Sequence, residues 1–489
     1  MTESAPTLGT RVSMLAADKP DASAITCSGR TLTRRELDSS TNRLARAFAE
    51  RGVGVGDYVT IALPNSIEFL QAAIAAWKLG AVPQPLPARL PDNEFQNLLD
   101  LHPRALIVGR ADPSGTTPSV DAGFTPDPAV PDAALPEAVS PTWKAMASGG
   151  STGRPKLIEA GGDSRTDLTP VSLAMGTKEE DVQLVSVPMS HNTGMTAATM
   201  GLTMGHHLVL MPRFDPAEFL RLVTETRVNW LFTVPTIMHR LLPVYDADPD
   251  AYDLSSLRRL WHVGAPCAPS VKQRWIELLG PDAVWELYGG TELQALAALS
   301  GGEWLQHRGS VGRVISGEMK VLDDDGNECP PGVSGEVYMR PSPGSAPTYR
   351  YIGATAKSRD GWDSLGDLGY FDEDGYLYLN DRRVDMFTVG GRNVYPAEVE
   401  GALAAHPKVL SCLVVGVPDE DLGQVPYAIV QADGLDEDAV IAFLSERIAH
   451  YKVPRTVEFT DTPLRDDAGK ARRSAVRDAI IARLAQARS

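Results

Sequence analysis

The chain has few cysteines, and none of them is spaced like a metal ligand. Four occur in 489 residues, and no two form a C-x-x-C pair. Neither a disulfide framework nor a zinc knuckle is therefore indicated. Unpaired thiols are typical of a reducing compartment, and we expect these four to be buried or incidental. They are Cys27, Cys267, Cys329 and Cys412.

Basic residues are also scarce relative to acidic ones. Lysine and arginine number 46 against 63 aspartates and glutamates, which gives a net charge of −17. A general binder of nucleic acid or of an anionic membrane surface needs basic patches, so the charge argues against both. A nucleotide needs only one local basic pocket, so the charge does not exclude ATP.

Long apolar runs are missing as well. No stretch approaches membrane-spanning length, and the segment 1–14 lacks the basic region and apolar core of a signal peptide. We therefore expect a cytoplasmic protein without membrane insertion. The content of 43% hydrophobic and 22% charged residues is typical of globular proteins, and 489 residues allow about three folding units.

The N-terminal part alternates strands and helices. Thr33 and Glu36 form a capping box before apolar residues at helical spacing, and Ser66 is placed to cap a second helix. Buried strands are expected at 58–63 and 81–84, one on each side of the second helix. Strand, helix and strand within so short a segment predict a parallel βαβ unit.

The same alternation recurs further along the chain. Four more strands are expected between helical stretches, near 104–108, 182–187, 228–234 and 257–263. The segment 111–141 interrupts the pattern with seven prolines. We interpret this segment as a surface connection rather than a domain linker, because the strands resume after it.

The pattern changes in the last third of the chain. Strands at 318–322 and 336–340 flank an acidic turn that contains glycine, and helices are expected near 396–405 and 436–449. The sequence therefore predicts an α/β protein.

We expect two domains. A large N-terminal domain of helix-covered sheets would span residues 1–382 and include a β-rich subdomain at about 310–382. A small, mobile α/β C-terminal domain would follow at 383–489.

A glycine-rich loop follows a strand expected at 143–147. The loop reads SGGSTGRPK over residues 148–156. Glycines let backbone N–H groups turn towards phosphate oxygens, hydroxyls add donors, and Lys156 adds positive charge. The order of residues does not fit a Walker A loop. Taken alone, the loop fits a flexible turn as well as it fits a phosphate site.

Three further signals follow in order. YGGTE at 288–292 ends a strand and offers a ring for a purine, a hydroxyl for a phosphate and a carboxylate for Mg²⁺. Asp367, followed fifteen residues later by Arg382, is suited to hold a ribose from two sides. Lys470 follows a glycine near the C-terminus. Taken alone, YGGTE fits a turn at a strand end equally well, Asp367 and Arg382 are each more typical of solvated surface charges, and a lone lysine such as Lys470 is almost always an ordinary surface lysine.

In this order and at these separations, the motifs resemble those of the adenylate-forming superfamily. That superfamily contains acyl-CoA synthetases, adenylation domains of peptide synthetases and beetle luciferases. The similarity extends from about Thr31 to Arg473. SGGSTGRPK matches the family's S-G-T-T-G-x-P-K, and YGGTE matches its Y-G-x-T-E. Further matches are GSVG (309–312), GEVYMR (335–340), SLGDLGY (364–370), DRRVDMFTVGGRNVYPAEVE (381–400) and HYKVPRTVEF (450–459).

The resemblance implies ATP, Mg²⁺ and CoA, and it assigns roles to residues of this sequence. The loop that surrounds the phosphates would be Ser148, Gly149, Gly150, Ser151, Thr152, Gly153 and Lys156, with Thr291 as a further phosphate contact. The adenine would be held by Tyr288, Gly289, Gly290 and the turn Gly264-Ala265-Pro266, and the ribose by Asp367 and Arg382. Glu292 would bind Mg²⁺, and Lys470 would bridge the substrate carboxylate and the α-phosphate. Val384 would be the hinge, Gly391 would line a pantetheine tunnel, and His191 would lie between the acyl pocket and the thiol.

The implied reaction has two steps. A carboxylic acid is activated by ATP to an acyl-adenylate with release of pyrophosphate, and CoA then takes the acyl group as a thioester. Three positions depart from the family pattern: Gly150-Ser151 replaces Thr-Thr, Val384 replaces a charged residue, and Leu464 replaces a proline. Lys470 is retained, so we expect adenylation to survive.

Two alternatives stay open at this point. In the first, the enzyme adenylates its acid and passes the acyl group to a carrier protein or a partner enzyme. In the second, the protein binds a nucleotide or an acyl group without catalysis. The second alternative is disfavoured by the retention of Thr152, Glu292, Asp367, Arg382 and Lys470.

The segment 188–192 bears on the substrate. It reads PMSHN, without the carboxylate that peptide-synthetase adenylation domains use to pair an α-ammonium group. A buried unpaired ammonium is costly, so α-amino acids should be poor substrates. The SGGSTGRPKLI form also resembles loops of ligases that act on steroid-like and bile acids. We therefore predict a bulky apolar carboxylic acid of the polycyclic or terpenoid kind.

Overall fold

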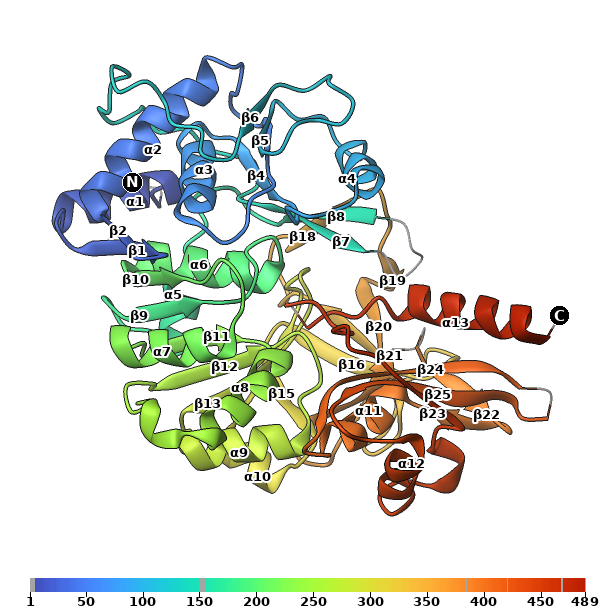
Figure 1. Cartoon of the computed structure of the whole chain (residues 1–489). Coiled ribbons are helices and arrows are strands. Elements are labelled where there is room, and N and C mark those ends of the chain that lie inside the picture. The colour runs from blue at the N-terminus through green and yellow to red at the C-terminus, as the bar shows by residue number, and fades with distance from the viewer. Residues whose placement is uncertain (1–4, 150–154, 383–384, 420, 468, 489) are drawn as a thin grey trace.

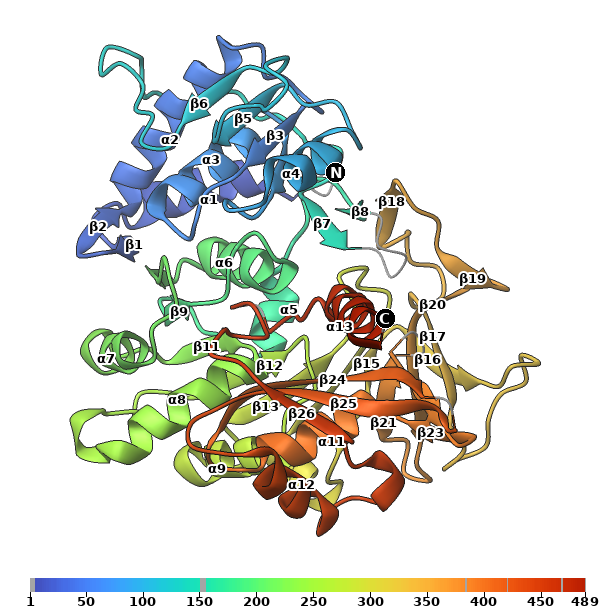
Figure 2. The same cartoon turned by 45° about the vertical axis from the view of Figure 1, so that its right-hand side comes forward.

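The computed structural model describes residues 5–149, 155–382, 385–419, 421–467 and 469–488. The N-terminal sheet, in blue, lies above a large sheet coloured green to yellow, and the orange and red C-terminal part lies beside the lower half of the molecule (Figure 1). Figure 2 shows the same arrangement after a turn of 45°. The layout agrees with the predicted α/β class, with a large N-terminal part and a smaller C-terminal part.

The first sheet contains the predicted βαβ unit. Its strands lie in the order β4-β3-β5-β6, and all neighbours are parallel. Thr33 caps α2 in a complete capping box with Glu36, and the Ser66 hydroxyl accepts a hydrogen bond from the N–H of Phe69 at the start of α3. The elements are α1 (Leu8–Asp18), α2 (Arg34–Ala49), β3 (Tyr58–Ile61), α3 (Ile67–Lys78), β4 (Val82–Pro85), α4 (Asp92–Leu99), β5 (Leu106–Gly109) and β6 (Ser119–Asp121).

The large sheet carries the other predicted strands. Its parallel part has the order β13-β12-β11-β9-β10-β1, and β2 completes that edge as an antiparallel strand. Its strands are β1 (Ser23–Cys27), β2 (Arg30–Thr33), β9 (Val182–Val185), β10 (His207–Leu210), β11 (Trp230–Thr233), β12 (Arg259–Val263) and β13 (Val284–Tyr288). Helices pack on it: α5 (Thr169–Ala174), α6 (Asn192–Met204), α7 (Pro216–Thr226), α8 (Pro235–Ala247) and α9 (Pro269–Leu279).

The β-rich segment after residue 310 continues the large sheet rather than forming a sheet of its own. β14 pairs antiparallel with both β13 and β15, and β15 pairs in turn with β21. Because each edge strand still offers backbone donors and acceptors, the ladder runs on into this segment. β14 (Leu296–Ser300) and α10 (Gly301–Gln306) lead into this segment. Its own strands are β15 (Ser310–Ser316), β16 (Glu318–Leu322), β17 (Gly335–Arg340), β19 (Lys357–Arg359), β20 (Trp362–Phe371) and β21 (Leu377–Arg382).

The proline-rich segment 111–141 is a mostly exposed connection, as predicted, and it adds the edge strand β6. Asp132 accepts hydrogen bonds from Ser39 and Arg43 on α2, which fixes the segment along that helix. A three-stranded sheet follows it, with β8 between β7 and β18. These strands are β7 (Ala145–Gly149), β8 (Pro155–Ala160) and β18 (Tyr349–Ile352).

The C-terminal part has its own sheet and apolar core. The core gathers around Val399, Val414, Ala428 and Leu444, all of which are buried. Its elements are β22 (Phe387–Val389), β23 (Arg392–Val394), α11 (Pro396–Ala404), β24 (Val409–Asp419), β25 (Gly423–Ala432), α12 (Glu437–Ser445), β26 (Thr456–Phe459) and α13 (Arg473–Arg488). A separate core supports the proposed division of the chain, although the boundary after residue 382 stays a prediction.

The cysteines are free, as expected. Cys27 and Cys412 are buried, and Cys267 and Cys329 are partly buried. Among the described residues, the helices include none with the length and apolar content that crossing a bilayer requires.

Candidate functional site

A cleft of about 2400 Å³ lies where the large sheet faces the C-terminal part. The parallel neighbours β12 and β13 end at Val263 and Tyr288, so the turns that follow them lie at the same edge of the sheet. The cleft brings together most of the residues that the motifs indicated. Its lining includes Ser148, Lys156, His191, Gly264, Ala265, Pro266, Tyr288, Gly289, Gly290, Thr291, Glu292, Asp367 and Lys470.

Some predicted site residues are described in part or not at all. Gly149 ends β7. The loop residues Gly150, Ser151, Thr152 and Gly153 and the hinge residue Val384 lie outside the described residues. Arg382 is placed by its backbone, which pairs with Asp367 across β20 and β21. The roles of these residues stay predictions.

Tyr288 and Asp367 are joined directly. The Tyr288 hydroxyl donates a hydrogen bond of 2.7 Å to Oδ2 of Asp367, whose side chain is nearly buried. Gly264, at the end of the neighbouring strand, has a φ of +83°, a conformation that favours glycine. An aromatic ring, a carboxylate and a tight backbone turn therefore line the same part of the cleft.

A second cluster surrounds Glu292. Glu292 is 5% exposed, its carboxylate accepts a hydrogen bond from the Tyr351 hydroxyl, and its Oε1 lies 3.5 Å from Nζ of Lys156. Lys156 also lies 3.7 Å from the centre of the Tyr351 ring. Burial and the nearby Glu292 carboxylate raise the pKa of the Tyr351 hydroxyl, which therefore stays protonated and donates. A Cβ on Gly290 would lie 2.6 Å from Oε2 of Glu292, so a side chain there would displace the carboxylate.

This cluster fits a magnesium ion held between protein and nucleotide. Within the residues that the structure describes, no three His, Cys, Asp or Glu side chains are grouped so that they could bind a metal alone. Mg²⁺ in nucleotide sites takes one or two carboxylates and fills its other positions with phosphate oxygens and water. Glu292, whose carboxylate lies beside the Lys156 ammonium, has the chemistry of such a carboxylate, and its binding of Mg²⁺ stays a prediction.

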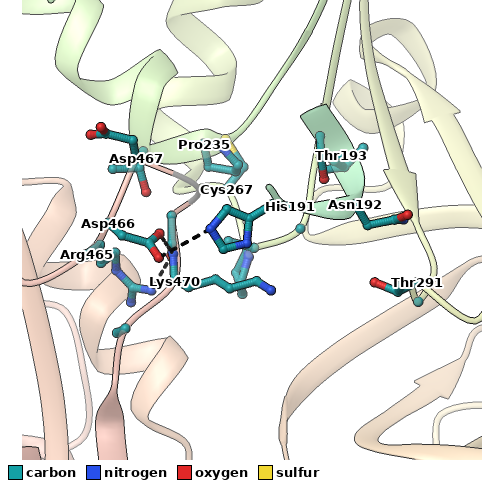
Figure 3. Close-up of a pocket in the computed structure, with 18 of the residues that line it drawn as sticks. His191, Asn192, Thr193, Pro235, Cys267, Thr291, Arg465, Asp466, Asp467 and Lys470 are labelled. Carbon is teal, nitrogen blue, oxygen red and sulfur yellow. Dashed lines mark hydrogen bonds and ion pairs between the residues drawn. The ribbon is translucent and has the colours of Figure 1, made fainter. Parts of the chain in front are cut away.

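Lys470 enters the cleft from the C-terminal part. Its side chain extends in the direction of Thr291, and His191 lies between its loop and Asn192 (Figure 3). The Lys470 N–H donates a hydrogen bond of 2.8 Å to Oδ1 of Asp466, whose Oδ2 lies 3.9 Å from Nε2 of His191. Burial, with the charge of Lys470, lowers the pKa of His191 to about 4. His191 is therefore neutral at pH 7, and its contact with Asp466 is not an ion pair.

Several contacts hold the loop that carries Lys470. Arg472 donates to both carboxylate oxygens of Glu94 at 2.9 and 3.0 Å, and Arg240 lies 3.5 Å from Asp467. Nε2 of His239 lies 2.9 Å from the carbonyl oxygen of Val409. The C-terminal part is thus bonded to both the first sheet region and α8.

The departure at Leu464 has a structural counterpart. Its side chain packs against the buried apolar side chains on one face of the C-terminal sheet, which include Leu413 and Val415. An apolar side chain can therefore anchor the start of this loop where the family has a proline.

Gly391 lies away from the cleft. It occupies the exposed turn between β22 and β23 with a φ of +77°, and an added Cβ would meet no atom within 4 Å. No narrow tunnel surrounds Gly391 in this arrangement, and its predicted contact with pantetheine stays a prediction.

The same cleft has an apolar part beneath α6, the apolar pocket. Its lining includes Met175, Met200, Phe232 and Trp261, and all four are almost fully buried. The indole N–H of Trp261 donates to the carbonyl oxygen of Met175 at 2.9 Å, and the ring packs against that of Trp285 with 5.0 Å between the ring centroids. The pocket is suited to a flat or bulky apolar group.

Lys144 is a charged residue of this region that the motifs did not indicate. It is 1% exposed, and its Nζ donates to Oδ1 of Asn192 at 2.5 Å and to Oγ1 of Thr196 at 2.6 Å. Burial lowers its pKa to about 7. A lysine directly before the apolar strand β7 was the available signal in the sequence.

The Lys144 pKa predicts a pH-dependent stability. In the unfolded chain the ammonium keeps its proton up to about pH 10, whereas in the folded protein it loses the proton near pH 7. Between these values the unfolded chain binds more protons, so wild-type stability should rise with pH. Lys144→Met should therefore be more stable by roughly 2–4 kcal/mol near pH 6, and this advantage should shrink towards pH 10. Urea unfolding at several pH values measures the difference, and a constant difference would contradict the prediction.

Comparison with known proteins identifies the family of this chain. Residues 13–350 match the model of the AMP-binding enzyme family, and residues 398–470 match that of the AMP-binding enzyme C-terminal domain. The chain belongs to the AMP-binding enzyme family. The resemblance inferred from the motifs is thereby confirmed.

Relatives of known activity cover almost the whole chain. The 2-succinylbenzoate–CoA ligase of Bacillus licheniformis is 31% identical over 470 residues, which cover 93% of this chain and 96% of that enzyme. The feruloyl-CoA synthase of an Amycolatopsis species is 32% identical over 481 residues, with 94% and 96% covered. The o-succinylbenzoate CoA synthetase of Bacillus subtilis, solved with its acyl-adenylate intermediate, superposes with a TM-score of 0.81 at 26% identity and covers 96% of this chain and 98% of its own.

This AMP-binding enzyme is accordingly an AMP-forming acid–thiol ligase. Its predicted reaction, from carboxylic acid to acyl-adenylate to CoA thioester, is supported by these relatives. ATP and Mg²⁺ accompany the same Bacillus subtilis enzyme in a second structure, with a TM-score of 0.80 at 26% identity over 95% of this chain and 98% of its own. ATP, Mg²⁺ and CoA are therefore the reactants and cofactor, as predicted.

Proposed function

We propose that this ligase activates a bulky apolar, cyclic carboxylic acid, of the polycyclic or terpenoid kind, in the cytoplasm and transfers it to CoA. One observation supports this most directly. One cleft is lined by the Tyr288–Asp367 pair, the Glu292 cluster, Lys470 and the apolar residues beneath α6. An acid whose ring contacts Trp261 and Met200 would lie in the cleft that Lys470 also lines.

The adenylation step is assigned to the cleft residues as follows. Tyr288 stacks on the adenine, and Asp367, opposite Arg382, accepts the ribose hydroxyls. Glu292 holds Mg²⁺, which offsets charge on the phosphates when bound. Lys470 holds the attacking carboxylate against the α-phosphate, where two anions otherwise repel each other. Thr291 and the loop 148–156 contact the remaining phosphate oxygens.

Transfer to CoA is assigned to a second arrangement of the C-terminal domain. Lys470 occupies the cleft here while Gly391 lies on an exposed turn. A rotation of the C-terminal domain at Val384 would move Lys470 out of the cleft and bring Gly391 to it. This movement would open a path for pantetheine past His191. The neutral imidazole of His191 leaves no fixed positive charge in the way of the thiol.

The substrate class is tested by acid-dependent exchange of labelled pyrophosphate into ATP. The acids to compare are cyclohexanecarboxylate, 1-naphthoate and cholate against phenylalanine. The described residues at the start of α6, Ser190, His191 and Asn192, offer no carboxylate for an α-ammonium group. Exchange should therefore be strong with at least one cyclic acid and weak with phenylalanine. Strong exchange with phenylalanine alone would contradict the proposed class.

Asp367→Ala should raise the KM for ATP. Loss of a charged acceptor for the ribose hydroxyls costs about 1.5–3 kcal/mol per hydrogen bond, which is roughly tenfold or more. Asp374→Ala, in the exposed turn between β20 and β21, is the matched control and should leave the KM unchanged. An unchanged KM in a folded Asp367→Ala variant would mean that Asp367 does not hold the nucleoside.

The alternative acceptor is a carrier-protein thiol or a partner enzyme. It shares the adenylation step, so pyrophosphate exchange does not separate it from the CoA reaction. The two acceptors are distinguished by supplying CoA in one reaction and a phosphopantetheinyl carrier protein in another. Thioester should form only with the true acceptor.

A further inference from the structure

The wall of the apolar pocket has a polar section on α6. Asn192, Thr196 and Met200 follow one another at helical spacing and all line the cleft. The first two are polar, and Met200, two turns into the helix, is apolar. A ligand in the pocket therefore meets hydrogen-bonding groups near the cleft mouth and apolar groups further along α6.

Lys144 lies behind this polar section. Its ammonium donates to Oδ1 of Asn192 and Oγ1 of Thr196, and it lies 4.1 Å from the centre of the Trp143 ring. Across the described chain, no carboxylate forms an ion pair with it. A buried ammonium that contacts only neutral groups is costly, so stability does not explain a lysine at this position.

The hydrogen bonds from Lys144 decide what the wall offers to a ligand. The Lys144 Nζ donates both hydrogen bonds whether it is an ammonium or, above its pKa of about 7, a neutral amine with two N–H groups, so it contacts the acceptor oxygens of Asn192 and Thr196 in both states. The Asn192 amide is thereby oriented with its NH₂ group away from Lys144. The Asn192 NH₂ is left as a donor for the cleft. The Thr196 hydroxyl donates to Oδ1 of Asn192 at 3.3 Å in this structure, and it can rotate to donate to a ligand instead, so both groups select an acceptor on the ligand.

We propose that Lys144 positions Asn192 and Thr196 as a pair of donors that bind an acceptor oxygen on the acyl group, either a keto group or a second carboxylate. The enzyme then prefers a cyclic acid with such an oxygen over the same acid without it. This inference rests on the proposed activation of a cyclic acid. It assigns a specificity-determining role to Asn192 and Thr196 and a positioning role to Lys144.

Matched acids test the proposal. Cyclohexanecarboxylate is compared with 4-oxocyclohexanecarboxylate and cyclohexane-1,4-dicarboxylate, and 4-phenylbutanoate with 4-oxo-4-phenylbutanoate. The readout is kcat/KM for pyrophosphate exchange. The wild type should prefer the oxygenated member of at least one set about tenfold or more. Comparison of the dicarboxylate with the ketone shows whether the donor pair prefers a charged or a neutral acceptor oxygen.

Variants separate positioning from a purely structural role. Thr196→Val and Lys144→Met should bring the preference close to one, because they remove a donor or release the amide. Thr199→Val is the matched control, since Thr199 is buried on the same helix and donates to the carbonyl oxygen of Met195. It should keep the preference.

The possible outcomes distinguish failure of this proposal from failure of the proposed function. Equal rates for both members of every set in the wild type would overturn the proposal. A Lys144→Met or Thr196→Val variant that loses rate equally for both members, with an unchanged ratio, would also overturn it. Absence of exchange with every acid would instead overturn the proposed function.

Discussion

Lys470→Ala is expected to lose acid-dependent pyrophosphate exchange by several orders of magnitude while it still converts a supplied acyl-adenylate to a thioester. In the first step the carboxylate meets the α-phosphate, and both are anions. The Lys470 side chain extends into the cleft towards Thr291, where these groups would meet (Figure 3). A positive charge in a partly dehydrated cleft stabilises such a transition state far more than it would in water. Attack by a thiol on the adenylate does not bring the two anions together.

Lys408→Ala is the control for this variant. Lys408 is an exposed lysine of the C-terminal part whose Nζ donates to the carbonyl oxygen of Gly434. It should keep both half-reactions. Exchange by Lys470→Ala within about tenfold of the wild type would show that its charge does not serve adenylation.

Gly391→Leu is expected to do the opposite, keeping exchange and losing thioester formation. In the arrangement described here Gly391 is exposed and has room for a side chain, so adenylation should proceed. In the rotated arrangement a side chain would narrow the path of pantetheine, where only glycine lets the backbone approach closely. The thioester rate with supplied acyl-adenylate and CoA should fall to near background.

The control for Gly391→Leu must account for backbone strain. Its φ of +77° disfavours leucine by roughly 1–2 kcal/mol. Gly423→Leu introduces comparable strain, since Gly423 has a φ of +78°, lies in the same C-terminal part and also has no atom near an added Cβ. If Gly391→Leu and Lys470→Ala fail at the same step, rotation of the C-terminal domain is not part of the mechanism.

Local sequence signals account for the parts of the fold that were predicted well. The Thr33–Glu36 box and Ser66 satisfy backbone N–H groups within one helical turn, so they mark helix starts without knowledge of the rest. The resemblance implied that the turns after Val263 and Tyr288 hold one adenine, and these turns do lie at the same edge, because their strands are parallel neighbours. The sheet side of the cleft follows from the parallel strands.

Contacts between distant segments were not predicted. Tyr351 reaches Glu292 because β18 pairs with β8, and no local pattern in the sequence fixes that register. The link between Arg472 and Glu94 depends on where the C-terminal part sits. The continuation of the large sheet through β14 and β15 was likewise invisible to periodicity, because both a separate and a joined sheet have the same alternation.

The central claim is that one enzyme couples AMP formation to thioester formation on a carboxylic acid. The most direct test is to incubate the wild type with ATP labelled at the α-phosphate, Mg²⁺, CoA and the acid that gives the strongest exchange, and then to quantify all products. We expect AMP, pyrophosphate and acyl-CoA in equal amounts, and no consumption of ATP when the acid is omitted. Formation of ADP and phosphate, or consumption of ATP without the acid, would contradict the account.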